Sequence, residues 1–336
     1  MKYTTLGLTF FSLNLFASEP GTIDLNADSI HTRDNFNLHH FIQSGDAEVD
    51  IIAVFESSAA DWAHRKMSKG SKVKSVKSFI DDRVNGAVAA PFKGIKLSGG
   101  GTIKINFVET VILEEDFSSE THKSLHKKIK SSDDWIIRLG AIREEHKADL
   151  VAIFKQPNSS DDAAGKAAYV RKITDHSAYK TYGFFSVNVD RAYKESYYMT
   201  TTHELGHILG AGHNIAALID SNGNPKRKDE KAPYNQGYGV AYNLSEYGET
   251  KPYAASIMSY TFHNGKNQCD LEQRVNDHEY DKTGDWGELP LTRFHKSCRR
   301  VPYFSDGGVS LGRGLSYPTN NASAIADSAR AVAGYY

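Results

Sequence analysis

The sequence predicts a mixed α/β fold, because strand-like and helix-like segments alternate along the chain. Apolar runs of strand length are followed by segments whose apolar residues recur at helical spacing. Hydrophobic residues make up 40% of the 336 residues, enough to form the core of one large domain. The final segment, after residue 320, also carries an apolar helical stripe. We therefore expect a mixed sheet covered by helices, with a helix at the C-terminal end.

Each element rests on a local pattern. Residues 49–55 and 149–154 are almost continuous apolar runs, typical of buried strands, whereas residues 103–110 alternate between apolar and polar. Serines before residue 133 are typical of a helix start. The predicted strands are residues 49–55, 103–110, 149–154 and a segment within 181–190. The predicted helices are residues 73–90, 133–147, 197–209 and 320–336.

The N-terminus resembles a secretory signal. Lys2 precedes a mostly apolar run over residues 6–16, and Ala17 provides a small residue for cleavage. The run is too short to span a bilayer, and a buried strand or helix is the alternative. We predict a signal peptide over residues 1–17, a linker or short pro-segment over 18–46, and one domain over 47–336. Secretion to the extracellular space is expected, with the periplasm as the alternative.

Charge limits the possible partners. Forty basic and forty-one acidic residues give a net charge of -1, so neither nucleic acid nor a stable membrane association is expected. Basic clusters at residues 72–77, 126–130 and 226–228 are interpreted as solvated faces and loops. The oligomeric state stays open, and a monomer is favoured.

Two cysteines, Cys269 and Cys298, are expected to form a disulfide if the chain is exported. Closing a loop of this length would stabilise the fold by about 3–4 kcal/mol. Their spacing argues against a thiolate zinc site. Calcium binding is possible but unsupported, because the Asp- and Asn-rich segment 220–233 lacks the glycine and glutamate positions of a calcium loop.

The segment HELGHILGAGH contains a metal-binding pattern. His203 and His207 are four residues apart, so on a helix their imidazoles lie on one face, one turn apart. Glu204 projects beside them and can reach a water molecule on the metal without occupying a ligand position. His213 can be a third ligand only if the helix ends, and Gly210 can adopt the positive φ that ends it.

Three imidazole ligands leave one tetrahedral position open, which is the pattern of catalytic zinc sites. Imidazole in this geometry most often holds zinc in an exported protein, although cobalt, nickel or copper could bind in vitro. We therefore predict one catalytic Zn²⁺.

These residues resemble the metzincin zinc endopeptidases, whose motif HExxHxxGxxH is followed by a turn that contains methionine. The segment Ser256-Ile257-Met258-Ser259-Tyr260 lies downstream of the third histidine. The resemblance implies a twisted mixed sheet, an active-site helix beside a zinc cleft, and Met258 as an apolar floor below the ligands. By itself, Met258 could equally be ordinary core filler.

The resemblance extends over residues 47–336 to the reprolysin-like, adamalysin-type branch and its bacterial secreted relatives. Two features depart from that branch. Asn214 stands where many reprolysins have aspartate after the third histidine, and no cysteine precedes Cys269 to cap the zinc from a pro-segment. A weaker alternative is that Asp46 offers its carboxylate to the zinc, as astacin pro-segments do.

The resemblance implies that the chain hydrolyses protein or peptide substrates by means of a zinc-bound water that Glu204 activates. Tyr260 matches the position of a tyrosine that binds the developing oxyanion in astacins and serralysins, but it could equally be a packing residue. The resemblance also implies an edge strand that pairs with extended substrate. We expect that strand within residues 181–190.

Three rival functions stay open at this stage. A catalytically silent zinc-binding recognition or toxin module would keep the fold, although the intact Glu204 argues against it. A narrow-specificity protease that cleaves next to acidic residues is a second possibility. A zinc hydrolase with a substrate other than protein is the third.

Overall fold

The structure of the protein is a computed structural model, which describes part of the chain. The described residues are 45–161, 163–168, 183–214, 238–239, 241–243, 253–259, 262–263, 266–267, 299–300, 302, 304–305 and 321–334. The chain divides into two compact units after residue 42, and all of the described residues belong to the second unit. Among the described residues, no helix is both long and apolar enough to cross a bilayer.

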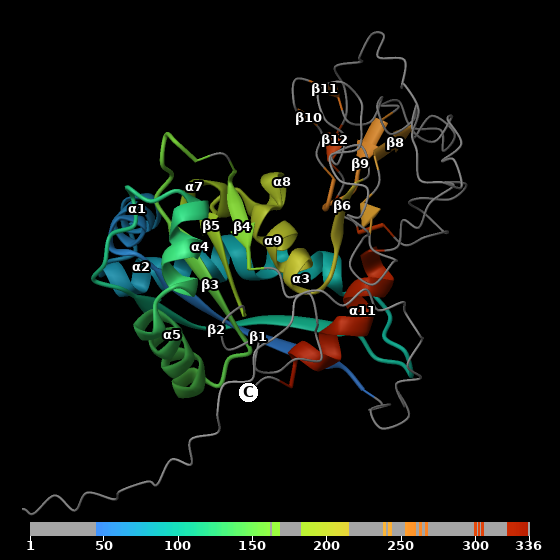
Figure 1. Ribbon diagram of the computed structural model, residues 1–336, viewed down its shortest axis with the longest axis horizontal. Helices are drawn as coiled ribbons and strands as arrows, with labels where there is room; N and C mark the ends of the chain where they lie inside the picture. Colours follow the sequence, from blue (N-terminus) through green and yellow to red (C-terminus); the bar gives the residue numbers. More distant parts are fainter. Residues whose placement is uncertain are drawn as a thin grey trace, which may run out of the picture. The chain divides into compact units, whose positions relative to one another are not determined.

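A five-stranded mixed sheet forms the centre of the fold (Figure 1). Its strands are β1 (Ala47–Phe55), β2 (Ile103–Ile112), β3 (Leu150–Lys155), β4 (Gly165–Ala167) and β5 (Phe184–Asn188). They are arranged in the order β2-β1-β3-β5-β4. All neighbours are parallel except β4, which runs antiparallel to β5. The predicted mixed α/β fold with its strands is thereby confirmed.

Helices provide the crossovers that parallel strands require. Three helices and a π-helical turn connect β1 to β2: α1 (Ser57–Met67), α2 (Lys72–Phe79), the π-helical turn Ile80–Asn85 and α3 (Gly86–Phe92). Two helices connect β2 to β3: α4 (His122–Lys130) and α5 (Asp133–His146). Side chains of Ser71, Thr121 and Ser132 accept a backbone N–H in the first turn of α2, α4 and α5.

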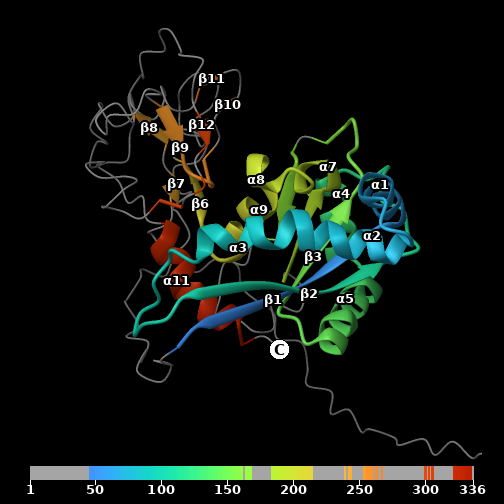
Figure 2. The same cartoon turned by 180° about the vertical axis from the view of Figure 1, so that it is seen from behind.

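The strand β1 separates two apolar cores, because successive side chains of a strand point to opposite faces. Ile51 and Phe55 pack in a core with α1, α2, α3 and the later helices. Ile52 and Val54 pack in a second core with residues of α4 and α5. Figure 2 shows α2 and α3 crossing one face of the sheet, and Figure 1 shows α4 and α5 on the other. Burial on both faces explains why this strand is a continuous apolar run.

The second half of the chain adds the helices that carry the predicted site. They are α7 (Val189–Ala192), α8 (Glu195–Tyr198), α9 (Thr200–Ile208) and α11 (Asn321–Val332). The short strands are β6 (Gly212–Asn214), β7 (Tyr238–Gly239), β8 (Ala241–Asn243), β9 (Tyr253–Ala255), β10 (Phe262–His263), β11 (Lys266–Asn267) and β12 (Arg299–Arg300). The predicted C-terminal helix is present as α11, and its stripe Ala324, Ile325, Ala329 and Val332 is buried.

Two local predictions were wrong. The segment 181–190 does not provide the sheet edge, because β5 lies between β3 and β4 and pairs with both. Residues 197–209 do not form one helix either. Met199 adopts a left-handed conformation (φ 53°) that ends α8, and α9 begins at Thr200.

Candidate active site

Helix α9 carries His203 and His207 one turn apart, and its N-terminus is anchored by Glu195. The two carboxylate oxygens of Glu195 accept the backbone N–H groups of Thr201 (2.9 Å) and Thr202 (2.8 Å). A carboxylate at this position satisfies free N–H groups and interacts favourably with the helix dipole. Burial raises the pKa of Glu195 above its usual value. The helix is therefore fixed at the end that precedes His203.

The chain reverses directly after α9 and brings His213 back toward the helix. Gly210 has a φ of 89°, a conformation that side chains rarely tolerate. Asn321, the first residue of α11, is buried and holds the backbone of Gly212 in both directions. Gly212 N–H donates to Asn321 Oδ1 (3.1 Å), and Asn321 Nδ2 donates to the Gly212 carbonyl (3.2 Å). The residue before His213 is thus tied to the C-terminal helix.

The three histidines converge through their Nε2 atoms. His213 Nε2 lies 3.2 Å from His203 Nε2 and 2.9 Å from His207 Nε2. The opposite ring nitrogens face carbonyl oxygens: His203 Nδ1 donates to Ile257 O (2.8 Å), and His207 Nδ1 donates to Ala211 O (2.9 Å). Since a carbonyl can only accept, the proton of each neutral ring lies on Nδ1. The Nε2 lone pairs of His203 and His207 therefore point into the shared centre.

This arrangement fits zinc. Two nitrogen ligands placed about 2.0–2.1 Å from a tetrahedral ion would lie about 3.4 Å apart, close to the observed separations. Two lone pairs that face one ring nitrogen cannot both be satisfied by a single N–H, whereas a cation satisfies all three rings. Burial lowers the pKa of His207 to about 4, so this ring is neutral and able to bind a metal at neutral pH.

Glu204 lies beside the histidines against the strand β4. Only 6% of its surface is exposed. Its carboxyl group packs on Gly165, where an added Cβ would lie 2.8 Å from Glu204 Cγ and 2.9 Å from Oε1. Helix α9 packs against both β4 and β5, and this carboxylate lies against β4, the last strand of the sheet order. A carboxylate in this position can accept and return a proton.

Met258 lies below the helix, in a turn closed by Ser256 and Ser259. Ser259 N–H donates to the Ser256 carbonyl (3.0 Å), and their hydroxyl oxygens are 3.0 Å apart. Met258 is fully buried and contacts α9 at Gly206, where an added Cβ would lie 2.6 Å from the Met258 sulfur. The turn thus contacts α9 twice, through Met258 at Gly206 and through the Ile257 carbonyl at His203.

Tyr260, Cys269 and Cys298 lie outside the described residues, as does the segment 220–233. The weaker alternative for Asp46 was wrong. Its carboxylate accepts the Thr102 backbone N–H (2.9 Å) and pairs with Lys104 (3.0 Å), so it binds residues at the start of β2.

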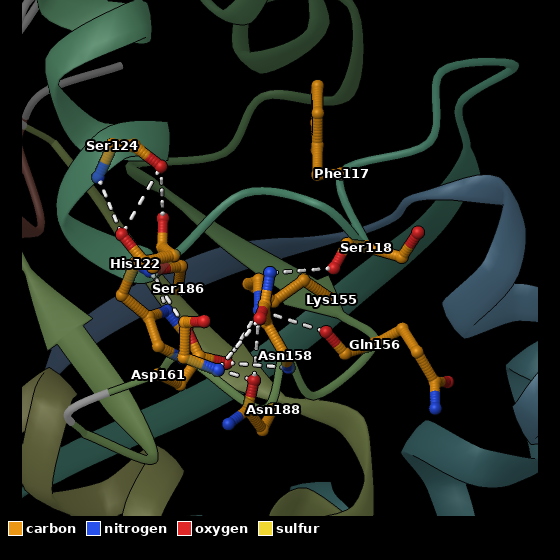
Figure 3. Close-up of polar contacts among 12 residues, drawn as sticks. Phe117, Ser118, His122, Ser124, Lys155, Gln156, Asn158, Asp161, Ser186 and Asn188 are labelled. Atoms are coloured by element: carbon orange, nitrogen blue, oxygen red, sulfur yellow. Dashed lines mark hydrogen bonds and ion pairs between the residues drawn. The ribbon is translucent and has the colours of Figure 1, made fainter.

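A buried polar cluster that the sequence analysis missed lies between α4, the end of β3 and β5 (Figure 3). The Lys155 ammonium, at the end of β3, is fully buried and pairs with Asp161 (2.8 Å). Asp161 also accepts the backbone N–H groups of Asn158 (2.9 Å) and His122 (3.1 Å). A buried ion pair with further hydrogen bonds at the carboxylate is the arrangement that compensates for lost hydration. The cluster therefore fixes the segment that follows β3, as far as Asp161.

Two histidines of α4 join the same cluster. His122 Nδ1 lies 2.7 Å and His126 Nε2 lies 2.9 Å from the hydroxyl of Ser186 on β5. The prediction that residues 126–130 are a solvated face was wrong for His126, which is 2% exposed. The missed signal is the spacing of His122, Leu125, His126 and Ile129, the buried stripe of α4.

His126 makes a specific contribution to acid stability. Burial, with the nearby charges of Lys130 and Lys166, lowers its pKa to about 2. Below its ordinary pKa of about 6.5, the unfolded chain therefore binds a proton that the folded chain does not, and acid favours unfolding. We expect this residue alone to lower the free energy of unfolding by about 2 kcal/mol between pH 8 and pH 5.

The variant His126→Gln tests this, because glutamine can hydrogen-bond Ser186 but does not titrate. Urea unfolding at both pH values, in the presence of a chelator, should give a pH dependence about 2 kcal/mol smaller than that of wild type. An unchanged pH dependence in the variant would contradict the assignment.

Comparisons with curated proteins and with individual solved structures give no basis for an inference about this chain. No curated protein matches it. One similar solved chain is described as "Structure of a chaperone-substrate complex", with 12% identity, a TM-score of 0.45, and coverage of 86% of this chain and 35% of that one. Another is "Crystal Structure of metalloproteinase-II from Bacteroides fragilis", with 16% identity, a TM-score of 0.26, and coverage of 50% and 43%. This chain thus spans less than half the length of either, and likenesses this weak support no inference.

The match to a family model is of a different kind. The model Reprolysin_5, described as metallo-peptidase family M12, matches residues 47–271, more than half of the chain. The matched region begins with β1 and includes α9, the three histidines and Met258. The family is zinc-dependent, and the histidine triad and the mixed sheet agree with membership. The chain belongs to metallo-peptidase family M12.

Proposed function

We propose that this protein is a secreted zinc-dependent endopeptidase. The observation that carries the proposal is the convergence of three imidazole Nε2 atoms beside the buried carboxylate of Glu204. His203, His207 and His213 would hold the ion and leave one position for substrate. A structural zinc site would fill all four positions with protein ligands, so this ligand set favours catalysis.

The carboxylate of Glu204 performs the proton transfers. When bound, zinc supplies a positive charge that polarises a carbonyl group and lowers the pKa of water toward about 7. Glu204 takes a proton from the attacking water and delivers it to the nitrogen of the departing amine. One water is consumed, and the carbonyl carbon exchanges its bond to nitrogen for a bond to oxygen.

The strand β4 is the proposed binding edge for the substrate backbone. It is the last strand in the sheet order, so its outer side has no partner strand among the described residues. An extended peptide can pair with such an edge through main-chain hydrogen bonds. Gly165, which contacts Glu204, lies in this strand. A peptide paired with β4 would therefore run past the proposed base.

Export and the role of Tyr260 are further parts of the proposal. Lys2 and the apolar run over residues 6–16 support removal of a signal peptide and secretion. The spacing of Tyr260 after Met258 supports a role in binding the oxyanion.

A peptide library tests the proposed activity. Zinc-loaded protein lacking residues 1–17 should cleave internal bonds of proteome-derived peptides, and a chelator should abolish cleavage until zinc is restored. The sequences around the cut sites would distinguish broad specificity from cleavage next to acidic residues. Zinc-loaded protein that cuts no peptide would contradict the proposal and favour a silent recognition module or another substrate class.

A further inference from the structure

We propose that Gly165 is a positioning residue for Glu204: the missing side chain at this point of β4 leaves the space in which the Glu204 carboxylate must lie. This inference rests on the proposed function of Glu204 as the base. Gly165 lies outside the HELGHILGAGH motif, and in this inference it determines the position of the Glu204 carboxylate.

The contact between the two residues is close. A Cβ built on Gly165 would lie 2.8 Å from Glu204 Cγ, 2.9 Å from Oε1 and 3.1 Å from Cδ. Two of these atoms belong to the carboxyl group and the third is the carbon that bears it, so an added methyl group would overlap the side chain from Cγ outward and force the carboxylate to move. The φ of Gly165 is not among the positive values of the described glycines. Alanine is therefore compatible with the backbone, and the three atoms nearest to its added Cβ all belong to Glu204.

The strand β4 is held in place on its inner side. Gly165 pairs with Val187 of β5, and Asn188 N–H donates to the carbonyl of Ala164 (2.9 Å). Four residues before Gly165, Asp161 binds the Lys155 ammonium and two backbone N–H groups (Figure 3). Moving the strand away from α9 would break contacts of a buried charge, which is costly. We therefore expect β4 to stay in place when a methyl group is added at position 165.

Helix α9 is equally constrained. Glu195 binds its first turn through the backbone of Thr201 and Thr202. On its other side, Gly206 lies against Met258, and His203 donates to the Ile257 carbonyl. With both backbones fixed, an added methyl group at position 165 must displace the side chain of Glu204. A displacement of about 1 Å is enough to cost about 10²-fold in rate when it affects a reacting group.

The variant Gly165→Ala tests the inference, with Gly140→Ala as its matched control. Gly140 lies in α5, where an added Cβ has no neighbour within 4 Å. We expect Gly165→Ala to lower kcat for peptide cleavage by about 10²-fold, with KM within about threefold of wild type. Zinc affinity should stay at the wild-type value, since none of the ligands is touched, and the melting temperature should fall by no more than a few degrees. Gly140→Ala should match wild type in kcat, KM and zinc affinity, and should raise the melting temperature slightly because alanine is the better helix former.

A second variant separates positioning from general damage. Glu204→Asp retracts the carboxylate by one methylene and should cost wild type about 10²-fold in kcat. In the Gly165→Ala background the carboxylate is already displaced, so the same change should cost less than about tenfold. Equal costs in the two backgrounds would overturn the inference. So would a Gly165→Ala protein that loses zinc affinity and melting temperature together with activity.

Crystal structures of wild type and Gly165→Ala keep the inference separate from the proposed function. The Glu204 carboxylate should shift by about 1 Å while the Cα atoms of β4 and α9 stay in place. If wild type cleaves no peptide, the proposed function fails, and this shift alone decides whether Gly165 positions Glu204. If wild type cleaves peptides and Gly165→Ala behaves like Gly140→Ala, the inference fails and the proposed function stands.

Discussion

Replacing Glu204 by glutamine is expected to lower kcat/KM for peptide cleavage by about 10³-fold or more while zinc stays bound. Glutamine keeps the shape of the side chain but cannot take a proton from water. Glu204 is buried and packs against Gly165. Because Glu204 supplies none of the three converging nitrogens, its loss should leave the ligand set intact.

The measurement is kcat/KM on a peptide from the library, together with zinc content by mass spectrometry. Glu144→Gln, at an exposed position of α5, is the matched control and should behave as wild type. A Glu204→Gln protein that keeps zinc and cleaves within about tenfold of wild type would remove Glu204 from the mechanism. A protein that loses zinc would instead make Glu204 part of the metal site.

Replacing His213 by alanine is expected to weaken zinc binding by at least about 10³-fold and to abolish cleavage. His213 is the ligand supplied from outside α9, so its loss leaves the helix and its two histidines folded. Two imidazoles with one open side hold zinc far less tightly than three. The chain reversal at Gly210 and the bonds from Asn321 to Gly212 would then have no metal ligand to position.

Zinc affinity can be measured by competition with a chromophoric chelator. His146→Ala, in α5, is the control histidine and should bind zinc as wild type does. Circular dichroism of both variants without metal would show that the fold is intact. Wild-type zinc affinity in a folded His213→Ala protein would contradict the assignment of the third ligand.

The sequence was informative where the determining contacts are local. His203 and His207 could be placed on one helical face because their spacing matches one turn. The strand β1 could be identified because burial on both faces requires a continuous apolar run. The helix α5 could be identified from the Ser132 cap and the pattern that follows it.

Other features depend on contacts between distant residues and could not be predicted in this way. The edge of the sheet was assigned to residues 181–190, because composition identifies a strand but not its place in the sheet order. The short strand β4 has only three residues and no periodicity to detect. Lys155 looked like an ordinary charged strand end, yet Asp161 and Asn188 compensate for its burial. The burial of Lys155 depends on the position of the loop after β3, which the sequence pattern does not indicate.

The helix break at Met199 depends on a single side chain that caps the following helix. The sequence pattern of residues 197–209 predicts one helix. The carboxylate of Glu195 turns back to bind the N–H groups of Thr201 and Thr202, and this cap is compatible only with a new helix start. Local propensity was thus overridden by a specific side chain-to-backbone contact.

The central claim, that the residues around His203, His207 and His213 hydrolyse peptide bonds, is tested most directly by isotope labelling. Library peptides would be incubated in H₂¹⁸O with zinc-loaded protein, and the new C-termini would be analysed by mass spectrometry. We predict one ¹⁸O atom in each new carboxyl group, and no new C-termini with the chelated protein or with Glu204→Gln. Zinc-loaded wild-type protein that generates no ¹⁸O-labelled C-termini would contradict the account.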